Sequence, residues 1–532
     1  MVYRGKPSTG CQNCRARHIK CDESRPHCRA CVRTGRSCPG YPHPLDVMLR
    51  RQTAFDRKKR NAPSNTGLSS TANNHKGAED ISRTPTPSDM SLSRTSTPST
   101  ISPKYPLLSE IKSSGVPHSL YFPLEDTVTS LFFNSYLYLP KDPLIRDGFM
   151  ELLPESYSKT TPGSHLHLSA LAVSFFSVAA WTGNSSLLRS AEHFFVKAIS
   201  KTRIALQEDI DENSDEILMT ILLLSTYEEF AAIKDKRLPA RAHLRGAIAL
   251  INSKGDRQLN STYTSTMTNS VQTQIIKTSM LARPPLVQTP NVWPLSPLVP
   301  QSPSSQLISA TSELVNLRRA WNLATITPGT YNIADISNIY ARAIDFDRHL
   351  SPWEHVVPEY WKPMPASIVP DSVRAAGAYR GRCDCYADQW IASMWNFYRE
   401  SRLVIQNIIL NCLRLLPETN DTPERIQSMI AQIRDIATDI CATVPFFLGS
   451  QKDSIHSNPS TIHYPETETR RTTQAHKQAA PLLGGWFVMF HLMNLCSPEL
   501  CLPEEQLAWI GQQIQRVHRI YNLDIYNGGM VV

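Results

Sequence analysis

Residues Thr9–Tyr41 read TGCQNCRARHIKCDESRPHCRACVRTGRSCPGY, and this stretch decides the structure of the N-terminal part of the chain. Its cysteines follow the spacing C-x2-C-x6-C-x6-C-x2-C-x6-C, which is two similar halves in succession. A C-x2-C turn places two thiolates on one metal ion, and a structural zinc ion takes four ligands in a tetrahedron. The spacing therefore predicts a zinc cluster whose ligands are Cys11, Cys14, Cys21, Cys28, Cys31 and Cys38.

Two tetrahedral zinc ions have eight ligand positions, so six cysteines suffice only if two of them bridge both ions. The symmetry of the pattern indicates Cys11 and Cys28, the first cysteine of each half. About forty residues bury too little apolar surface to fold alone, and metal ligation supplies the missing free energy. Disulfides or six unrelated thiols are the alternatives. The N-terminus lacks the apolar core of a secretory signal, so we expect a reducing intracellular compartment, which disfavours disulfides.

The charge of the chain is concentrated in the same region. Residues 1–60 contain 15 Lys and Arg against 4 Asp and Glu, although the whole chain has a net charge of only +8. A basic arm on a nearly neutral body is typical of a protein that binds a polyanion. This pattern favours double-stranded DNA as the partner.

At these residues the chain resembles the fungal binuclear zinc cluster family of transcription regulators. Lys20–Asp22, Pro26 and the trailing Pro-Gly-Tyr match that family's pattern. The resemblance implies two short helices, one after each C-x2-C pair, packed around two zinc ions. It also implies that the end of the first helix enters the major groove, commonly at a CGG triplet.

The resemblance further assigns four DNA contacts. Arg17 and His18 would face base edges, whereas Arg15 and Lys20 would lie near phosphates. Arg17 suits a bidentate contact to guanine. The family often has Lys or Arg where this chain has His18, and a neutral imidazole offers one donor and one acceptor. The identity of the triplet is therefore left open.

A basic run follows the cluster and contains a candidate nuclear import signal, Arg57, Lys58, Lys59 and Arg60. A solvated charge run is the alternative. Many relatives carry a coiled coil here, but residues 42–62 lack the three or four heptads that one requires. We therefore expect no dimer through this segment, although a homodimer through the rest of the chain stays open.

Half of residues 61–104 are Ser, Thr or Pro, 22 of 44, and large apolar residues are nearly absent. Such a segment cannot bury enough surface to offset its ordering entropy, so we predict a disordered linker. The expected organisation is a cluster at 1–45, a basic and then disordered linker at 46–119, and a regulatory domain at 120–532.

The regulatory domain is predicted to be all-α. An apolar run from Leu166 to Trp181 is too short and too rich in serine for a membrane span and favours a buried helix. Asn213 and Glu216 resemble a capping box that starts another helix. Further helices are predicted after Pro239, from Asp421 through Ile440, and from Leu507 to Tyr521. Residues 283–306 and 449–475, rich in Pro or polar residues, are predicted to be loops that project from this body.

The runs His243–Gly255 and Pro481–Leu500 resemble landmarks of the fungal-specific transcription factor domain, across roughly residues 121–527. That resemblance implies effector response, contact with a co-regulator or the transcription machinery, and transcriptional control.

Other chemistry-bearing residues point to no site. The pairs His165/His167 and Cys383/Cys385 could each supply two metal ligands, but no second pair of ligands follows either of them at the spacing of a zinc site. We interpret the remaining cysteines, Cys412, Cys441, Cys496 and Cys501, as core residues. No catalytic or phosphate-binding motif is present, so we expect no enzyme.

We therefore predict a nuclear, sequence-specific regulator of RNA polymerase II genes, specific to a metabolic or secondary-metabolite pathway. The alternative is an effector-sensing or scaffold protein whose DNA contact is weak and non-specific.

Overall fold

The computed structural model describes two parts of the chain. The first comprises residues 11–22, 24, 27–36 and 38, and the second comprises 123–526 with gaps at 138–141, 143, 146–147, 208–209, 238, 255–261, 282–300, 328 and 455–460. Three predictions fall outside these residues. They concern the linker at 46–119, the import candidate Arg57–Arg60 and the absence of a coiled coil at 42–62. The chain divides into two units, Met1–Pro123 and Leu124–Val532.

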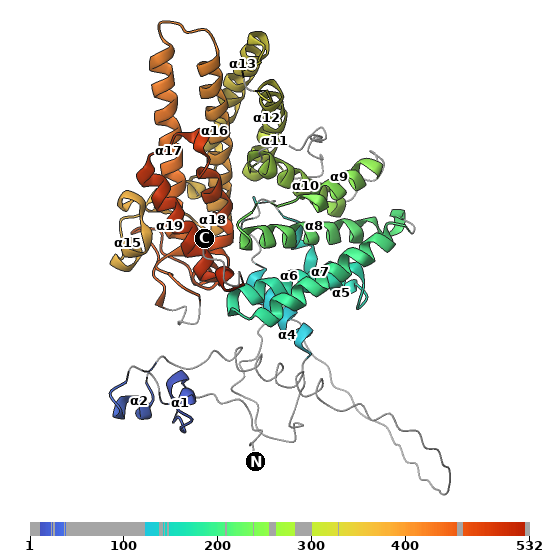
Figure 1. Ribbon diagram of the computed structural model, residues 1–532, viewed down its shortest axis with the longest axis vertical. Coiled ribbons are helices and arrows are strands. Elements are labelled where there is room, and N and C mark those ends of the chain that lie inside the picture. The colour runs from blue at the N-terminus through green and yellow to red at the C-terminus, as the bar shows by residue number, and fades with distance from the viewer. Residues whose placement is uncertain are drawn as a thin grey trace, which may run out of the picture. The chain divides into compact units, whose positions relative to one another are not determined.

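Within the first unit the structure describes two short helices, α1 (Gln12–Ala16) and α2 (Arg29–Arg33), one after the first cysteine of each half. Within the second unit, Figure 1 shows a body built from helices, as the sequence predicts. Its helices are α4 (Leu124–Leu131), α5 (Leu153–Lys159), α6 (His165–Thr182), α7 (Ser185–Ala205), α8 (Ile210–Lys234), α9 (Ala242–Lys254), α10 (Thr262–Leu281), α11 (Pro303–Thr311), α12 (Glu313–Ala324), α13 (Ile333–Leu350), α14 (Trp353–Val356), α15 (Asp371–Gly377), α16 (Gln389–Leu415), α17 (Thr422–Leu448), α18 (Gln474–Leu495) and α19 (Glu504–Ile520).

Short elements complete this unit. A π-helical turn, η1, covers Phe132–Tyr136, and 3-10 turns cover Phe149–Glu151, Glu359–Trp361, Tyr379–Gly381, Pro498–Leu500 and Leu523–Tyr526. The strands among the described residues are two pairs of residues, β1 (Met364–Pro365) and β2 (Asp384–Cys385), which pair antiparallel. The all-α prediction is confirmed.

Helix α6 is buried nearly all around, and its serines do not prevent this. Ser169, Ser174 and Ser177 are buried, and the Ser169 hydroxyl donates to the Leu166 carbonyl at 2.9 Å. Among the described helices it alone has the length and composition to cross a membrane, and 78% of it is buried inside the unit. The prediction of a buried helix is confirmed.

The long helices α16 and α17 form an antiparallel hairpin joined by residues 416–421 (Figure 1). Helix α17 begins where the sequence predicts it, with Pro423 in its first turn. Helix α18 approaches its neighbours at a glycine pair, since a Cβ on Gly484 would lie 2.1 Å from the Phe447 carbonyl oxygen. A Cβ on Gly485 would lie 2.4 Å from the Tyr521 ring, so both positions require glycine.

Arg516 of α19 joins several segments of this C-terminal region. Its side chain is buried and donates to one side-chain oxygen, that of Gln513, and to backbone carbonyls at the end of α17, in the segment after it and at the end of α15. Burial lowers the pKa of this guanidinium to about 10. A single cation thereby satisfies carbonyls that the helix end leaves without an intrahelical partner.

Two boundary predictions are wrong. Helix α8 begins at Ile210, so Asn213 and Glu216 lie inside this helix and not at its start. Glu216 instead accepts a hydrogen bond from the Thr160 hydroxyl at 2.8 Å. Helix α11 begins at Pro303, within the segment predicted to be a loop, because Ser302 and Ser305 form a reciprocal capping box.

The segment 449–473 is irregular, as predicted, but it packs into the unit. Tyr464 is buried, and Glu466 pairs with Ile368 through two backbone hydrogen bonds. The Arg470 guanidinium donates to three backbone carbonyls, those of Tyr360, Lys362 and Cys385. The expectation that this loop projects is therefore wrong for its described residues.

Candidate metal centre and nucleic-acid interface

The six N-terminal cysteines converge in the structure. Their sulfur atoms fall into two groups of four, and within each group all sulfurs lie within 4.8 Å of one another. The two groups share Cys11 and Cys28, whose sulfurs are 3.7 Å apart. One group adds Cys14 and Cys21, and the other adds Cys31 and Cys38.

The backbone builds these groups from two equivalent halves that are 17 residues apart. The Cys14 N–H donates to Cys11 Sγ at 3.4 Å, and the Cys31 N–H donates to Cys28 Sγ at 3.3 Å. A hydrogen bond after each helix is also common to both halves. The Ile19 N–H donates to the Cys14 carbonyl, and the Arg36 N–H donates to the Cys31 carbonyl. The sequence repeat is therefore also a structural repeat.

Two residues beyond the end of each helix of the cluster the backbone is left-handed, but the residue type at this place differs between the halves. His18 has φ 53° after α1, and Gly35 has φ 62° at the equivalent place after α2. Glycine adopts this conformation without strain, whereas other residues favour it less and histidine is among the better tolerated. The first half thus carries a side chain where the second half carries none, and that side chain is exposed.

The donor set fits zinc. Burial raises the pKa of the Cys11, Cys14, Cys28 and Cys31 thiols. Buried thiols without a nearby cation stay protonated, and a divalent ion at their centre favours the thiolate form. Soft thiolate ligands in groups of four are the set that zinc prefers in structural sites.

Asp22 holds the second half in place. Its carboxylate accepts the Arg29 N–H at 3.0 Å, which caps α2, and it accepts the Ser24 hydroxyl at 2.7 Å. The Ser24 hydrogen bond is the main cause that lowers the pKa of this carboxyl group. The residue that follows Cys21 therefore connects both halves of the cluster.

The surface of the first half presents an exposed run of five residues, Ala16–Lys20. Arg17, His18 and Lys20 lie in this run directly after α1. The structure thus brings three of the four predicted DNA-contacting residues together. The side chain of the fourth, Arg15, is not among those that the structure describes. The import candidate Arg57–Arg60 lies outside the described residues as well.

The other predicted positions show ordinary structural roles. His165 Nδ1 is 2.8 Å from the Thr220 hydroxyl, and the His167 ring stacks on Tyr157. Cys383, Cys385, Cys412 and Cys441 are buried, but Cys496 is exposed and Cys501 is half-buried, so the prediction of a core position is wrong for these two. Among the described residues, the six N-terminal cysteines are the only cluster arranged to hold a metal ion.

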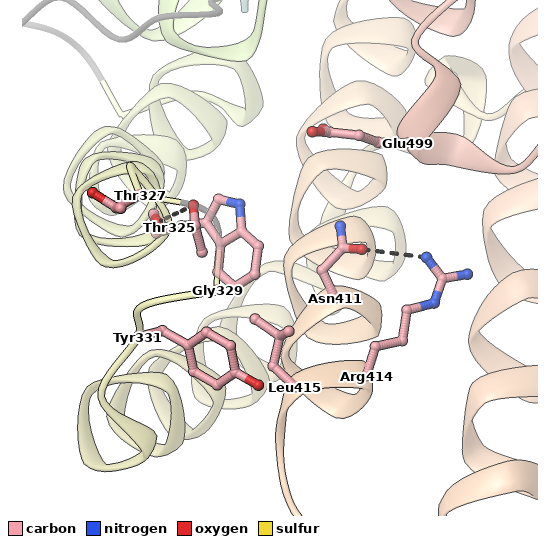
Figure 2. Close-up of a pocket in the computed structure, with 9 residues that line it drawn as sticks. Thr325, Thr327, Gly329, Tyr331, Asn411, Arg414, Leu415 and Glu499 are labelled. Carbon is pink, nitrogen blue, oxygen red and sulfur yellow. Dashed lines mark hydrogen bonds between the residues drawn. The ribbon is translucent and has the colours of Figure 1, made fainter.

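Sequence reasoning missed a cavity of about 360 Å³ in the helical unit, lined by residues of α12, the following loop, α16 and the turn at Pro498–Leu500 (Figure 2). These residues are far apart in the sequence and form no motif, so no spacing could have indicated them.

Comparison with known proteins agrees with these observations. The Fungal Zn(2)-Cys(6) binuclear cluster domain matches residues 9–46, and the Fungal specific transcription factor domain matches residues 121–450. Transcription factor dbaG of Emericella nidulans is 21% identical over 412 residues, which is 73% of this chain and 89% of that protein.

Two further relatives match at the cluster alone. The Zn(2)-C6 fungal-type transcription factor afumD of Aspergillus fumigatus is 67% identical over 41 residues, 8% of this chain and 11% of that protein. The aspercryptin biosynthesis cluster-specific transcription regulator atnN of Emericella nidulans is 58% identical over 38 residues, 7% of this chain and 6% of that protein. No solved structure matches the chain. These relatives are transcription regulators and not enzymes.

Proposed function

Because this chain belongs to the family of fungal-specific transcription factors with a Zn(2)-Cys(6) binuclear cluster, we propose that it recognises a short GC-rich, CGG-like triplet in double-stranded DNA. The observation that carries the proposal is the exposed run Ala16–Lys20, which begins at the last residue of α1 and lies between the ligand candidates Cys14 and Cys21. Its cations supply the positive charge that attracts the phosphate backbone, and its donors suit base edges.

In this proposal the metal is structural. Cys11 and Cys28 would be shared by two zinc ions, Cys14 and Cys21 would complete one site, and Cys31 and Cys38 would complete the other. Bound zinc supplies the free energy that holds the two halves together. The two sulfur groups, which share Cys11 and Cys28, support this assignment.

The DNA contacts divide by residue type. Arg17 donates two hydrogen bonds to a guanine edge, and His18 contacts a neighbouring base. Lys20 and Arg15 contact phosphates, which position the cluster without reading sequence. The left-handed conformation of His18 supports a functional side chain, since the equivalent residue of the second half is Gly35.

The wider role follows from the relatives. A regulator named for a biosynthesis cluster is among the proteins that match the cluster, which supports control of a metabolic or secondary-metabolite pathway. Such control takes place in the nucleus, and Arg57–Arg60 is the candidate import signal. The helical unit is then the surface for a co-regulator or the transcription machinery, and for any homodimer.

Selection from a random duplex pool tests this function. Full-length protein should enrich a GC-rich triplet. Arg17→Ala should relax the preference at one base position and cost roughly 1–3 kcal/mol on the selected site. Arg33→Ala, an exposed arginine of the second half, is the matched control and should leave base preference unchanged. Enrichment of no motif by the zinc-loaded protein would favour the alternative of an effector-sensing or scaffold protein.

A further inference from the structure

The cavity in the helical unit has two unlike walls. Its volume of about 360 Å³ lies at the small end of the range for small-molecule sites, which is roughly 300–1,000 Å³. One wall comes from α12 and the loop before α13, and it includes Trp321 and Tyr331. The other comes from α16, as Figure 2 shows for Asn411, Arg414 and Leu415.

The backbone that carries the aromatic wall is held by local hydrogen bonds. Trp321 is only 8% exposed, and its carbonyl accepts both the N–H and the hydroxyl of Thr325, which ends α12. The loop then makes a turn in which the Thr330 N–H donates to the Thr327 carbonyl and Gly329 has φ 80°. Glycine adopts this left-handed conformation without strain. This turn places Tyr331 at the cavity.

The polar wall is a ladder of side-chain hydrogen bonds along α16. Asn407 Nδ2 donates to Glu499 Oε2 at 3.2 Å, and Asn411 Nδ2 donates to Asn407 Oδ1 at 3.1 Å. Arg414 donates to Asn411 Oδ1 at 3.3 Å (Figure 2). The ladder therefore runs from a carboxylate at one end to a guanidinium at the other, and both of these residues line the cavity.

The charge of Arg414 is available to a ligand. Its hydrogen bonds in the structure go to neutral acceptors, Asn411 Oδ1 and Cys501 Sγ, and no described carboxylate lies within ion-pair distance of it. Arginine suits bidentate recognition of a carboxylate. Glu499, at the opposite end, is an acceptor for a hydroxyl group.

We propose that this cavity binds a small planar aromatic carboxylate that carries a hydroxyl group at its far end. The ring lies along Trp321 and Tyr331, the carboxylate pairs with Arg414, and the hydroxyl donates toward Glu499. Bound in this way, the ligand connects the hairpin of α12 and α13 to the end of α16. The site is independent of how the zinc cluster reads DNA, so each proposal can fail without the other.

The test is isothermal titration calorimetry of the full-length, zinc-loaded protein with three probes, benzoate, 4-hydroxybenzoate and 4-hydroxycinnamate. At least one hydroxylated probe should bind with a Kd on the order of 1 mM or tighter, as expected for about ten non-hydrogen atoms. Methyl 4-hydroxybenzoate, which has no carboxylate, and cyclohexanecarboxylate, which has no aromatic plane, should bind at least about tenfold more weakly.

Three variants locate the binding. Arg414→Gln and Tyr331→Leu should each raise the Kd of the best probe at least about tenfold, since one loses a charge-assisted hydrogen bond and the other an aromatic face. Both residues are exposed, so neither change should lower the melting temperature. Arg319→Gln, an exposed arginine of α12 outside the cavity, is the control and should bind as the parent does. Binding of no probe, or equal binding by all three variants, would overturn the proposal.

Discussion

Among the described residues of the N-terminal unit the buried side chains are cysteines, whereas the buried side chains of the helical unit are mostly aliphatic and aromatic. In the first unit the cysteines form the buried cluster, while the aliphatic residues Ile19 and Val32 are 40% and 64% exposed. In the second unit Trp361, Phe397 and Phe447 are almost fully buried. One unit therefore depends on an ion for its stability, and the other depends on the burial of apolar surface.

The largest effect should come from a shared cysteine. Cys28→Ser removes a ligand from both groups of four, so the variant should lose both zinc ions and the fold of the N-terminal unit, because structural zinc contributes about 10–16 kcal/mol in zinc-finger peptides. Zinc content of the full-length protein measures this. Cys38→Ser, which touches one group, should keep about one ion. Retention of two ions by Cys28→Ser would exclude bridging. Calorimetry should show an unchanged helical unit in both variants.

In the helical unit the matching change is Arg516→Met. The substitution keeps the length of the side chain but leaves buried carbonyls at the end of α17 without a donor, which should cost roughly 3 kcal/mol or more. Arg519→Met, an exposed change three residues later on the same helix, should stay within about 0.5 kcal/mol. Denaturant unfolding measures both, and zinc content should not change. A similar loss in the two variants would show that burial of Arg516 is not the cause.

Acid should weaken the helical unit through His476. This residue is buried against Phe446 and Tyr464, and burial lowers its pKa to about 4 from an ordinary 6.5. The His476 imidazole therefore binds a proton more readily in the unfolded chain than in the folded one. Its contribution to the free energy of unfolding is complete above pH 6.5 and is lost as pH falls toward 4. Between pH 7.5 and 5 the loss should be on the order of 2 kcal/mol.

Denaturant unfolding at both pH values tests this, and His476→Gln should show a shallower dependence on pH. Glu229 opposes the trend, since burial raises the pKa of its carboxyl group to about 7 and its contribution to stability falls as pH rises above 4.5. Glu229→Gln should therefore steepen the dependence that His476→Gln reduces. If both variants had the pH profile of the parent, other groups would control the acid response.

The smallest effect should come from His18. His18→Gly gives both halves of the cluster the same left-handed residue, so zinc should resist a chelator slightly more strongly, by about 1 kcal/mol at most. DNA affinity should nevertheless fall, because the proposed contact of His18 with a base is lost. A competition titration with a chelator and a binding titration at fixed salt measure the two effects. Gly35→Ala is the reverse control and should loosen the metal without altering base preference. Unchanged DNA binding by His18→Gly would remove this side chain from recognition.

The two units also differ in how far the sequence predicts them. The cluster is set by ligands close together in the chain, so cysteine spacing alone predicts which sulfurs meet. Helices such as α17 are also predictable, because an apolar stripe along one face and a proline in the first turn are signals that lie within the helix itself.

Other elements give no such local signal. Helix α10 reads TYTSTMTNSVQTQIIKTSML and looks like a polar segment, yet most of it is buried. Ser270 and Thr273 satisfy their hydroxyls on carbonyls four residues earlier, so they cost little when buried. Arg516 can likewise be buried because carbonyls of segments distant in the sequence accept its hydrogen bonds. The cavity has the same origin, because its two walls are about eighty residues apart in sequence.

The glycine pair of α18 determines where the helical unit can move. At Gly484 the backbone of α18 lies against the backbone of α17, and at Gly485 it lies against the Tyr521 ring, so one helix cannot slide past the other without a collision of these atoms. A shear motion between α17, α18 and α19 would have to separate these surfaces first. The turn at Gly329 has open space where a side chain would stand. If the cavity binds the proposed ligand, we therefore expect the response to be a hinge motion at the turn around Gly329, with α17, α18 and α19 keeping their packing.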